Sequence, residues 1–389
     1  MGITLPDKGF VFWPVGTGDS STVVIKPDET VLQIDLHHLT KSDDDDDPHC
    51  AIVDELVDCL PKKNGKPYLS VFALTHPDKD HIQGFSDLYD KVTIGEIWHT
   101  PRIFREYKKD LCDDAVAFKG EVTRRRDVNI KKNGNVAIGD MVRVIGHDVI
   151  FESGDYKDFP EYWRTYPGNT ITDINNESVE DNFIAFVHAP FKDDSATERN
   201  DSSLSLQIVL YDGDGTAKAL FFGDRKYPTI KQIFEKTKEK KRTHYLEWNV
   251  MLASHHCSKG VMYWQGEDDD QEKLKKDIMD EFEANKLDGG FIISSSESDF
   301  SDKDGKNPPH LKARKRYEEI VDSGNFLCTH EHPNEKKPVP IVFELDSGGL
   351  SYQQKTSKAK TTQKSALGLA IEAARGEDEP PSEKVGFGI

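Results

Sequence analysis

The sequence predicts a mixed α/β fold, and two observations support this. Short apolar segments rich in Val, Ile and Phe recur along the chain and are bounded by Gly, Pro and Asp, as is typical of β-strands. Between them lie segments whose apolar residues recur at helical spacing, such as Ile52, Val53, Leu56, Val57 and Leu60. Strands and helices that alternate in this way place the chain in the α/β or α+β class.

Strands are expected to open the chain. Three of them, separated by turns that contain Gly, Pro or Asp, are predicted at residues 11–15, 21–26 and 31–36. A helix is predicted at 51–60, and the short apolar segment 69–75 is typical of a buried strand. The aspartate run 43–47 is expected to be a solvated loop, because clustered like charges repel one another.

The pattern weakens between about 100 and 182, where no period is sustained, and we interpret this segment as an insertion. Regular strand patterns then return at residues 183–188, 203–211, 217–222, 245–253, 290–294, 325–329 and 339–345. Helices are predicted at residues 227–238, 271–285 and 309–322. The last residues, 355–389, are rich in Lys, Thr, Ser, Gly and Pro, so we expect a flexible tail after a domain that spans 1–354.

Composition excludes several broad classes. The 70 acidic and 51 basic residues give a net charge of −19, which argues against a protein that coats nucleic acid. No segment approaches the roughly 18 consecutive apolar residues of a membrane helix, so no membrane association is expected. The five cysteines are widely spaced and form no CxxC pair, which disfavours a disulfide framework. We therefore expect a soluble, cytoplasmic protein.

The most informative segment of the chain directly follows the predicted strand 69–75. It holds four side chains that can bind metal within six residues: His76, Asp78, Asp80 and His81. A tight loop at the end of a strand can direct imidazoles and carboxylates to one point, and these are the donors that zinc and manganese accept. The loop therefore predicts a metal site.

This loop resembles the H-x-H-x-D-H metal-binding motif of the metallo-β-lactamase superfamily, with Asp78 where the second histidine usually stands. The form H-P-D-x-D-H-x-x-G, residues 76–84, is similar to the version in the C-terminal domain of ComEC, the DNA-uptake channel of competent bacteria. Further segments resemble the same group in the same order, at residues 32–35, 200–206, 220–224, 252–259, 292–296, 308–310 and 326–329. The resemblance covers about residues 9–354.

The resemblance implies an αββα sandwich of two mixed β-sheets with helices outside. It also implies two divalent metal ions, with His76 and Asp78 serving one ion and Asp80 and His81 the other. Asp224 matches the carboxylate that bridges the two ions, and His255 matches the last histidine ligand, while its neighbour His256 could instead face substrate. Asp35 is similar to the early aspartate that supports the metal loop through hydrogen bonds.

Two positions depart from the family pattern. The histidine usually found between the loop and the bridging aspartate is hard to find, and the alternatives are His188, Asn200, Ser202 and Ser203. Cys257 stands where glycine is usual in the H-H-G-S-K motif, which leaves the local loop conformation open. Because Asp78 contributes oxygen instead of nitrogen, the site is expected to accept Zn²⁺ or Mn²⁺, with Mg²⁺ also open.

The resemblance implies a metal-dependent hydrolase. We expect a binuclear phosphodiesterase or nuclease in which Asp80 and Asp224 orient the attacking group and His310 or Lys259 stabilises the leaving group. Basic residues concentrate in three segments, at 102–132, 225–242 and 312–316, and a basic rim suits a phosphodiester. DNA is the first expected substrate, and a free nuclease would need restraint by a partner protein or a role in defence against foreign DNA.

Two alternatives remain open from the sequence. One is a small-molecule metallohydrolase, such as a cyclic-nucleotide phosphodiesterase, a lactonase or a thioesterase. The other is a non-catalytic regulatory module whose metal site has decayed, which the missing histidine and Cys257 would explain. The remaining histidines, among them His49 and His330, are expected to be surface or core residues.

Overall fold

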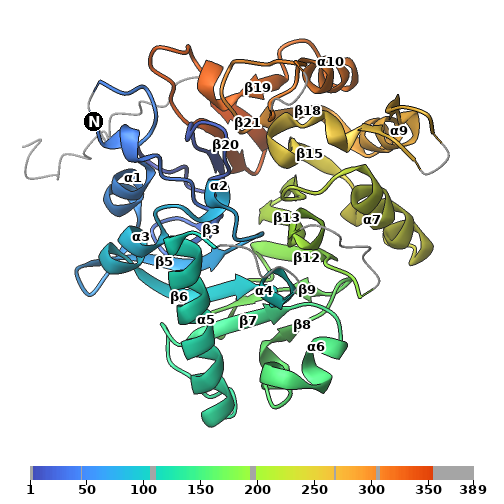
Figure 1. The fold of residues 1–389 in the computed structure, drawn as a ribbon. Helices are drawn as coiled ribbons and strands as arrows, with labels where there is room; N and C mark the ends of the chain where they lie inside the picture. The colour runs from blue at the N-terminus through green and yellow to red at the C-terminus, as the bar shows by residue number, and fades with distance from the viewer. Residues whose placement is uncertain are drawn as a thin grey trace, which may run out of the picture. The chain divides into compact units, whose positions relative to one another are not determined.

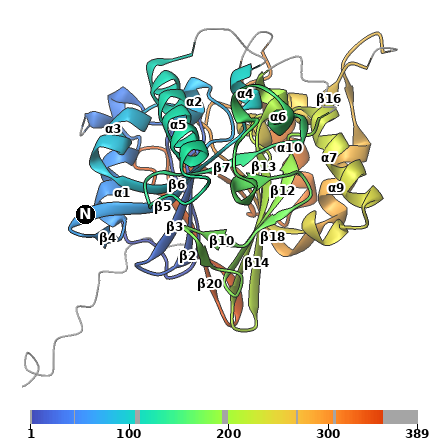
Figure 2. The same cartoon turned by 90° about the horizontal axis from the view of Figure 1, so that it is seen from below.

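The computed structural model describes residues 3–44, 46–105, 111–192, 199–266, 269–303 and 307–353. Within these residues, two mixed β-sheets face each other and helices cover the outer face of each sheet (Figures 1 and 2). The four layers are the αββα sandwich that the sequence predicted, so this expectation is confirmed. Residues 355–389, for which a flexible tail was expected, lie outside the described residues.

The first sheet has the strand order β21-β20-β1-β2-β3-β5-β6-β7-β8, with β4 paired to β5. Its strands are β1 (Gly9–Phe12), β2 (Ser21–Lys26), β3 (Thr30–Ile34), β4 (Lys62–Lys63), β5 (Lys66–Ala73), β6 (Thr93–His99), β7 (Met141–Ile145), β8 (Arg164–Thr165), β20 (Ile341–Asp346) and β21 (Gly349–Gln353). Neighbouring strands in the series β3-β5-β6-β7-β8 are parallel, and the other pairs in this sheet are antiparallel.

The second sheet has the order β19-β18-β15-β14-β13-β12-β9. Its strands are β9 (Thr170–Ile171), β12 (Phe183–Ala189), β13 (Ser205–Asp212), β14 (Gly215–Phe221), β15 (Trp248–Leu252), β18 (Lys286–Ser294) and β19 (Phe326–Cys328). The four strands β14, β15, β18 and β19 run parallel to one another. Two short hairpins complete the strands, with β10 (Asp173–Ile174) and β11 (Glu177–Ser178), and β16 (Tyr263–Trp264) and β17 (Lys273–Leu274).

The helices form two outer layers. The α-helices are α1 (Ile52–Cys59), α2 (Lys79–Ile82), α3 (Phe85–Lys91), α4 (Arg102–Arg105), α5 (Asp113–Lys131), α6 (Val149–Glu152), α7 (Tyr227–Glu239), α8 (Ser254–Cys257), α9 (Lys276–Ala284) and α10 (Leu311–Ile320). Single turns of 3₁₀-helix are η1 (Thr40–Asp43), η2 (Gly154–Tyr156), η3 (Glu161–Trp163), η4 (Arg199–Ser202), η5 (Thr243–Tyr245), η6 (Lys259–Val261) and η7 (Thr329–Glu331). None of the helices in the described residues is both long and apolar enough to cross a bilayer.

Three apolar cores hold the layers together. The central core joins the facing sides of the two sheets and includes Phe12, Val71, Ile208 and Phe221. A second core lies between the first sheet and α1, α3 and α5, and a third lies between the second sheet and α7, α9 and α10. Each sheet is therefore buried on both faces, which explains why its strands read as continuous apolar runs.

Helix α5 was not predicted from the sequence. Its inward face carries Glu121, Arg125 and Asn129, all buried, alongside Phe118 and Val122, so polar residues interrupt the apolar period. The Arg125 guanidinium donates to the backbone oxygens of Ile94, Gly95 and Met141 at distances of 2.9–3.0 Å and pairs with Glu121. Segment 100–182, interpreted as an insertion, extends the first sheet with β7 and β8 and the second sheet with β9. Its status as an insertion stays a prediction.

The aspartate run 43–47 is exposed, as expected, at Asp43, Asp44 and Asp46, whereas Asp47 is half-buried. Asp43 lies 3.0 Å from the Nε2 atom of His38, and Asp47 pairs with the buried His49. The expectation is confirmed at Asp43, whose side chain is 57% exposed. It was wrong at Asp47, because this carboxylate has a buried imidazole partner that the run itself does not reveal.

Candidate metal centre

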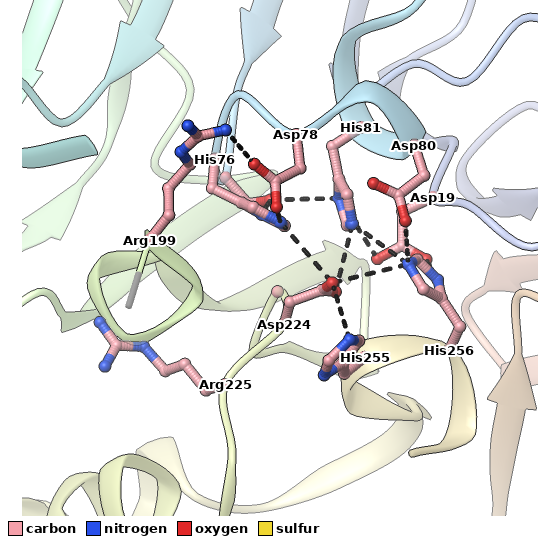
Figure 3. A network of polar contacts seen from close by, with 12 residues as sticks. Asp19, His76, Asp78, Asp80, His81, Arg199, Asp224, Arg225, His255 and His256 are labelled. Carbon is pink, nitrogen blue, oxygen red and sulfur yellow. Dashed lines mark hydrogen bonds and ion pairs between the residues drawn. The ribbon is translucent and has the colours of Figure 1, made fainter. Parts of the chain in front are cut away.

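Four loops bring ionisable side chains together between the two sheets. In the first sheet, Asp35 follows β3, and the loop 76–81 follows the neighbouring parallel strand β5. In the second sheet, Asp224 follows β14, and the pair His255–His256 follows the neighbouring parallel strand β15. Because parallel strands end at the same edge of a sheet, these loops meet where the two edges face each other (Figure 3).

Asp224 lies at the centre of the cluster and is buried. Its Oδ2 atom lies 3.6 Å from the Nε2 atoms of His76, His255 and His256. Its Oδ1 atom lies 3.2 Å from the Nε2 atom of His81. One carboxylate thus faces four imidazoles, each through the same ring nitrogen (Figure 3).

Further carboxylates flank Asp224 on two sides. Near His76, the Oδ2 atom of Asp78 lies 3.9 Å from the imidazole Nε2 atom. Near His81, the ring of His256 lies between Asp80, at 3.3 Å from Nε2, and Asp19, at 3.2 Å from Nδ1. One buried set of ligand atoms, all within 4.8 Å of one another, comes from Asp19, His81, Asp224 and His256.

The donors fit divalent metal ions. Among the described residues, the buried His76 Nε2 and Asp224 Oδ1 atoms lack a well-aligned hydrogen bond. Burying such atoms without a partner is unfavourable, and the Nε2 atoms of His81 and His256 also lie only 3.2 Å apart. Imidazole nitrogens and carboxylate oxygens in this arrangement are the donors of zinc and manganese sites, and a cation among them would satisfy all of these atoms.

Asp35 orients the loop. Its carboxylate accepts hydrogen bonds from the Thr75 backbone N–H at 2.7 Å, the Thr75 hydroxyl at 2.6 Å and His81 Nδ1 at 2.8 Å. With its Nδ1–H donated to Asp35, His81 turns Nε2 toward Asp224 at 3.2 Å, where its lone pair can bind a metal ion once the Nε2 proton has left. A carboxylate that holds an imidazole in this way is a common support of metal-binding histidines.

The electrostatics of the cluster favour an ionised Asp224. Burial alone would raise the pKa of Asp224, but the four surrounding imidazoles outweigh it and hold this pKa well below its usual range. Burial would lower the pKa of His81, yet Asp224 and Asp35 raise it well above its ordinary value. In this state a proton on His81 neutralises the carboxylates, and metal binding would release it.

The segment after β15 has an uncommon backbone. His255, His256 and Cys257 all adopt left-handed conformations, with φ angles of +52°, +51° and +65°. Each such non-glycine residue costs about 1 kcal/mol or more, so the surrounding contacts must hold the segment in place. The Ser254 hydroxyl does so by donating to the backbone oxygens of Gly223 and Arg225, both at 2.7 Å. This backbone conformation brings both imidazoles of α8 to within 3.6 Å of the Asp224 Oδ2 atom.

The sequence favoured His255 as the ligand and left His256 to face substrate. The structure places His256 within the buried set, and His255 also reaches Asp224, with a side chain that is 20% exposed. Both rings are thus placed to bind metal. That their backbone lies in the left-handed region is not visible from the letters His-His-Cys.

Other residues predicted for the site lie around it and do not join the cluster. The ring of His188 interacts with the Tyr245 backbone oxygen at 3.0 Å and with the Thr237 hydroxyl at 3.4 Å. The Lys259 ammonium pairs with Glu272 at 2.9 Å. The His310 Nδ1 atom accepts a hydrogen bond from the Lys259 backbone N–H at 3.2 Å, so this ring supports the loop after His256.

The segment proposed to replace the missing histidine lies against the metal loop. Asn200 and Ser202 belong to η4, and the backbone oxygen of Asn200 accepts a hydrogen bond from the Ser203 backbone N–H at 3.1 Å. A Cβ atom on Gly223 would lie 2.8 Å from the Ser203 Cβ atom, so only glycine allows this approach beside Asp224. The Thr75 backbone oxygen accepts from the Leu204 N–H at 3.0 Å, which ties the segment to the loop 76–81.

Sequence reasoning missed two residues of the site. Asp19, in the Gly-rich turn between β1 and β2, contributes a buried carboxylate beside His256. Arg199 pairs with Asp78, and its guanidinium lies beside the cluster (Figure 3). An aspartate in a glycine turn and an arginine in a polar loop are too common for either to stand out. Their roles follow only from where the fold places them.

Comparisons with known proteins give remote similarities. No protein-family model and no curated protein sequence matches the chain. Similar solved structures include a diphosphatase of the PhnP family, with 10% identity, a TM-score of 0.37, and coverage of 85% of this chain and 86% of the other. They also include the subclass B3 metallo-β-lactamase BJP-1 of Bradyrhizobium japonicum, with 14% identity, a TM-score of 0.30, and coverage of 64% and 74%.

A third similar structure is the di-zinc class B3 metallo-β-lactamase LRA-12 from an Alaskan soil metagenome, with 10% identity, a TM-score of 0.30, and coverage of 64% and 76%. Identities and TM-scores this low do not carry a functional assignment. What the chain itself presents is a buried cluster of imidazoles and carboxylates, with the geometry of a metal site, between the two sheets of an αββα sandwich.

Proposed function

We propose that this chain is a metal-dependent hydrolase that binds two divalent ions and cleaves phosphodiesters. The observation that carries the proposal is Asp224, whose two carboxylate oxygens face different imidazoles and which has a further carboxylate on each side. One ion would be held by His76, Asp78, Asp224 and His255, and the other by Asp80, His81, Asp224 and His256, with Asp19 beside it. When bound, such ions activate water and neutralise charge on the reacting phosphoryl group.

The residues of the chain would perform three tasks. Asp80 accepts from His256 and its carboxylate is ionised, because His256 and His81 outweigh the effect of burial and lower its pKa. It can therefore help to hold an ion and can orient the attacking water by accepting a hydrogen bond, whereas so low a pKa makes it too weak a base to take the proton. Asp35 holds His81 in one tautomer, and the strained segment after β15 holds His255 and His256 in place. Arg199 supplies a cation at the rim of the cluster.

Arg199 and Asp78 favour a phosphodiester over an uncharged carbonyl substrate. The carboxylate of Asp78 adds negative charge where the superfamily motif has a neutral imidazole, and the Arg199 guanidinium pairs with that carboxylate. A guanidinium fits phosphate oxygens through two parallel hydrogen bonds. A phosphate that approaches the cluster can thus replace Asp78 as the partner of Arg199 while Asp78 turns to the metal.

The three basic segments give little support for an extended groove that binds nucleic acid. Many of their side chains already pair with acids, as Lys231 does with Asp277 at 3.1 Å and Lys238 does with Glu281. Arg314 pairs with Glu331 at 2.6 Å. DNA remains our first substrate because the segment 76–84 resembles the ComEC motif. The paired cations favour a small phosphodiester, such as a cyclic nucleotide, as the second candidate.

The test compares the wild type with Asp224→Ala, with Zn²⁺ or Mn²⁺ present. Substrates are single- and double-stranded DNA, RNA, cyclic dinucleotides and bis(p-nitrophenyl) phosphate, with a lactone and a thioester as uncharged esters. Asp269→Ala is the matched control, because the Asp269 carboxylate contacts Lys273, Lys275 and the Gly266 backbone N–H, none of which belongs to the cluster. We expect phosphodiester cleavage by the wild type and the control and its loss in Asp224→Ala.

Equal cleavage by all three proteins, or none by any, would remove the phosphodiesterase proposal. Cleavage of the lactone or thioester alone would replace it with a carboxylic-ester hydrolase. Binding measured between 50 and 200 mM salt separates DNA from a small substrate, because each phosphate contact adds to the salt dependence. If DNA is cleaved, we further propose that a partner protein restrains the activity or that the activity serves defence against foreign DNA.

A further inference from the structure

A second cluster of metal-binding side chains lies apart from the candidate metal centre. It consists of His49, Glu297 and His330, whose ligand atoms all lie within 4.8 Å of one another. His49 lies in the loop before α1, Glu297 follows β18, and His330 lies in η7 directly after β19. Strands β18 and β19 are parallel neighbours, so the segments that follow them meet at the same edge of the second sheet.

The two imidazoles share one carboxylate. The His49 Nε2 atom lies 2.8 Å from Glu297 Oε1, and the His330 Nε2 atom lies 3.4 Å from Glu297 Oε2. The rings are stacked with centroids 4.9 Å apart and planes inclined by 28°. Both histidine side chains are buried, whereas the side chain of Glu297 is 35% exposed. Glu297 therefore connects the cluster to solvent.

Asp47 holds His49 in a defined orientation. The Asp47 carboxylate accepts from His49 Nδ1 at 2.5 Å and from the His49 backbone N–H at 2.9 Å. With its Nδ1–H donated to Asp47, the ring turns Nε2 toward Glu297 at 2.8 Å, and the Nε2 lone pair can bind a metal ion that takes the place of the Nε2 proton. Metal-binding histidines are typically held by a carboxylate on the other ring nitrogen in this way.

The local backbone is built for close approach. Gly16 has a φ angle of +78°, and a Cβ atom there would lie 3.3 Å from His49 Cδ2 and 3.4 Å from Glu297 Oε1. The Thr17 hydroxyl accepts a hydrogen bond from the Glu297 backbone N–H at 3.2 Å. The same turn, residues 16–19, ends at Asp19 of the candidate metal centre, so Glu297 is connected to that centre by a short stretch of backbone.

We propose that His49, Glu297 and His330 bind a further divalent ion, Zn²⁺, at a site separate from the candidate metal centre. Two imidazole nitrogens and one carboxylate oxygen are a donor set that zinc accepts, with a fourth position on the exposed side for water. The ion joins the loop before α1 to the ends of β18 and β19. It thereby holds the turn 16–19, and with it Asp19, in place. The inference does not depend on the proposed hydrolytic function.

The test counts metal ions per chain. Wild-type protein and variants are loaded with Zn²⁺, passed over a desalting column and measured by plasma mass spectrometry. The key background is the double variant His81→Ala/Asp224→Ala, which removes the candidate metal centre and should keep one ion per chain. Adding His330→Gln to this background should abolish that ion. Adding His332→Gln should not, because His332 contacts the Tyr352 hydroxyl instead, at 2.8 Å.

The proposal is overturned if the double variant retains no zinc. It is also overturned if the triple variant with His330→Gln retains as much zinc as the double variant. Circular dichroism establishes that each variant is folded. If His330→Gln does not fold, Glu297→Gln takes its place, because this partly exposed side chain keeps its volume. Co²⁺ gives a second readout: the double variant should show the visible absorption bands of a four-coordinate ion, and these should be absent from the triple variant. Phosphodiesterase activity enters none of these measurements, so failure of the proposed function leaves the result interpretable.

Discussion

Replacing Asp35 with Asn should weaken metal binding without altering the backbone. Asp35 has a φ angle of +56°, a conformation that Asn tolerates better than most residues, so the turn after β3 is preserved. The substitution exchanges one acceptor oxygen for an NH₂ donor at a buried position where three hydrogens converge. Whichever way the amide turns, at least one buried donor then faces another donor.

The magnitude follows from the three hydrogen bonds. Loss of the charge-assisted bond to His81 and of a neutral bond to Thr75 corresponds to about 2–4 kcal/mol of unfolding free energy. His81 also loses the partner that fixes its tautomer, for which a fall in metal affinity of about 10- to 100-fold is typical. Urea unfolding measures the first quantity, and competition with a chromophoric zinc chelator measures the second.

Asp54→Asn is the matched control, because Asp54 forms an exposed ion pair with Lys91. It should change stability by less than about 1 kcal/mol and leave zinc affinity unchanged. If folded Asp35→Asn protein binds zinc within twofold of the wild type, then Asp35 does not orient His81 for metal. The assignment of the cluster as a metal centre would then rest on the candidate ligands alone, without the carboxylate that holds one of them.

Three further predictions concern stability and the approach of loops. Burial lowers the pKa of His99 from 6.5 to about 3, so the native state keeps this ring neutral, and stability present above pH 6.5 is lost as pH falls toward 3. Between pH 7.5 and 5, protonation of His99 in the unfolded state should lower the free energy of unfolding by about 2 kcal/mol. Urea unfolding of His99→Phe should lack this part of the pH dependence. If His99→Phe and the wild type depend on pH to the same extent, the prediction is contradicted. In Gly18→Ala the new Cβ atom would lie 2.0 Å from His37 Nδ1. Zinc affinity, measured by dialysis against a chelator, should therefore fall at least tenfold. Gly65→Ala is the control: this position has open space around it but a φ angle of +80°, so the substitution should lower stability and leave zinc affinity unchanged. Arg125→Leu removes the donor of three backbone oxygens and one of the two arginines that pair with Glu121, while Arg124 still holds this carboxylate at 2.8 Å. The substitution should cost about 2–4 kcal/mol in thermal or urea unfolding. A cost below about 1 kcal/mol would show that water replaces the guanidinium.

The fold was predictable where local pattern and burial agree. Strands such as β2 and β13 have apolar centres, at 23–25 and 208–210, and are buried over most of their length inside the sandwich. The helix predicted at 227–238 keeps the amphipathic period of α7. Helix α5 was not predicted, because its buried arginine donates to backbone oxygens of a strand about 30 residues away in the sequence. Polar residues at inward positions look like solvent-facing ones until the tertiary structure shows what they contact.

The candidate site divides in the same way. The sequence by itself determined the candidate ligands that lie close together along the chain, His76 to His81, because six residues of loop cannot place them far apart. The order of Asp35, Asp224 and His255 then indicated the rest of the set. Only the tertiary structure decided that Asp19 and Arg199 join it and that His256 reaches Asp224 as well as His255 does.

The cluster of His49, Glu297 and His330 depended entirely on tertiary structure. His49 and Glu297 are 248 residues apart in the sequence. None of the three residues belongs to a motif in its own segment. They meet because β18 and β19 end at one edge of the second sheet while the loop before α1 crosses to it. Residue type and spacing determine which local donors a chain offers, but convergence of distant donors depends on strand order, which is a property of the whole fold.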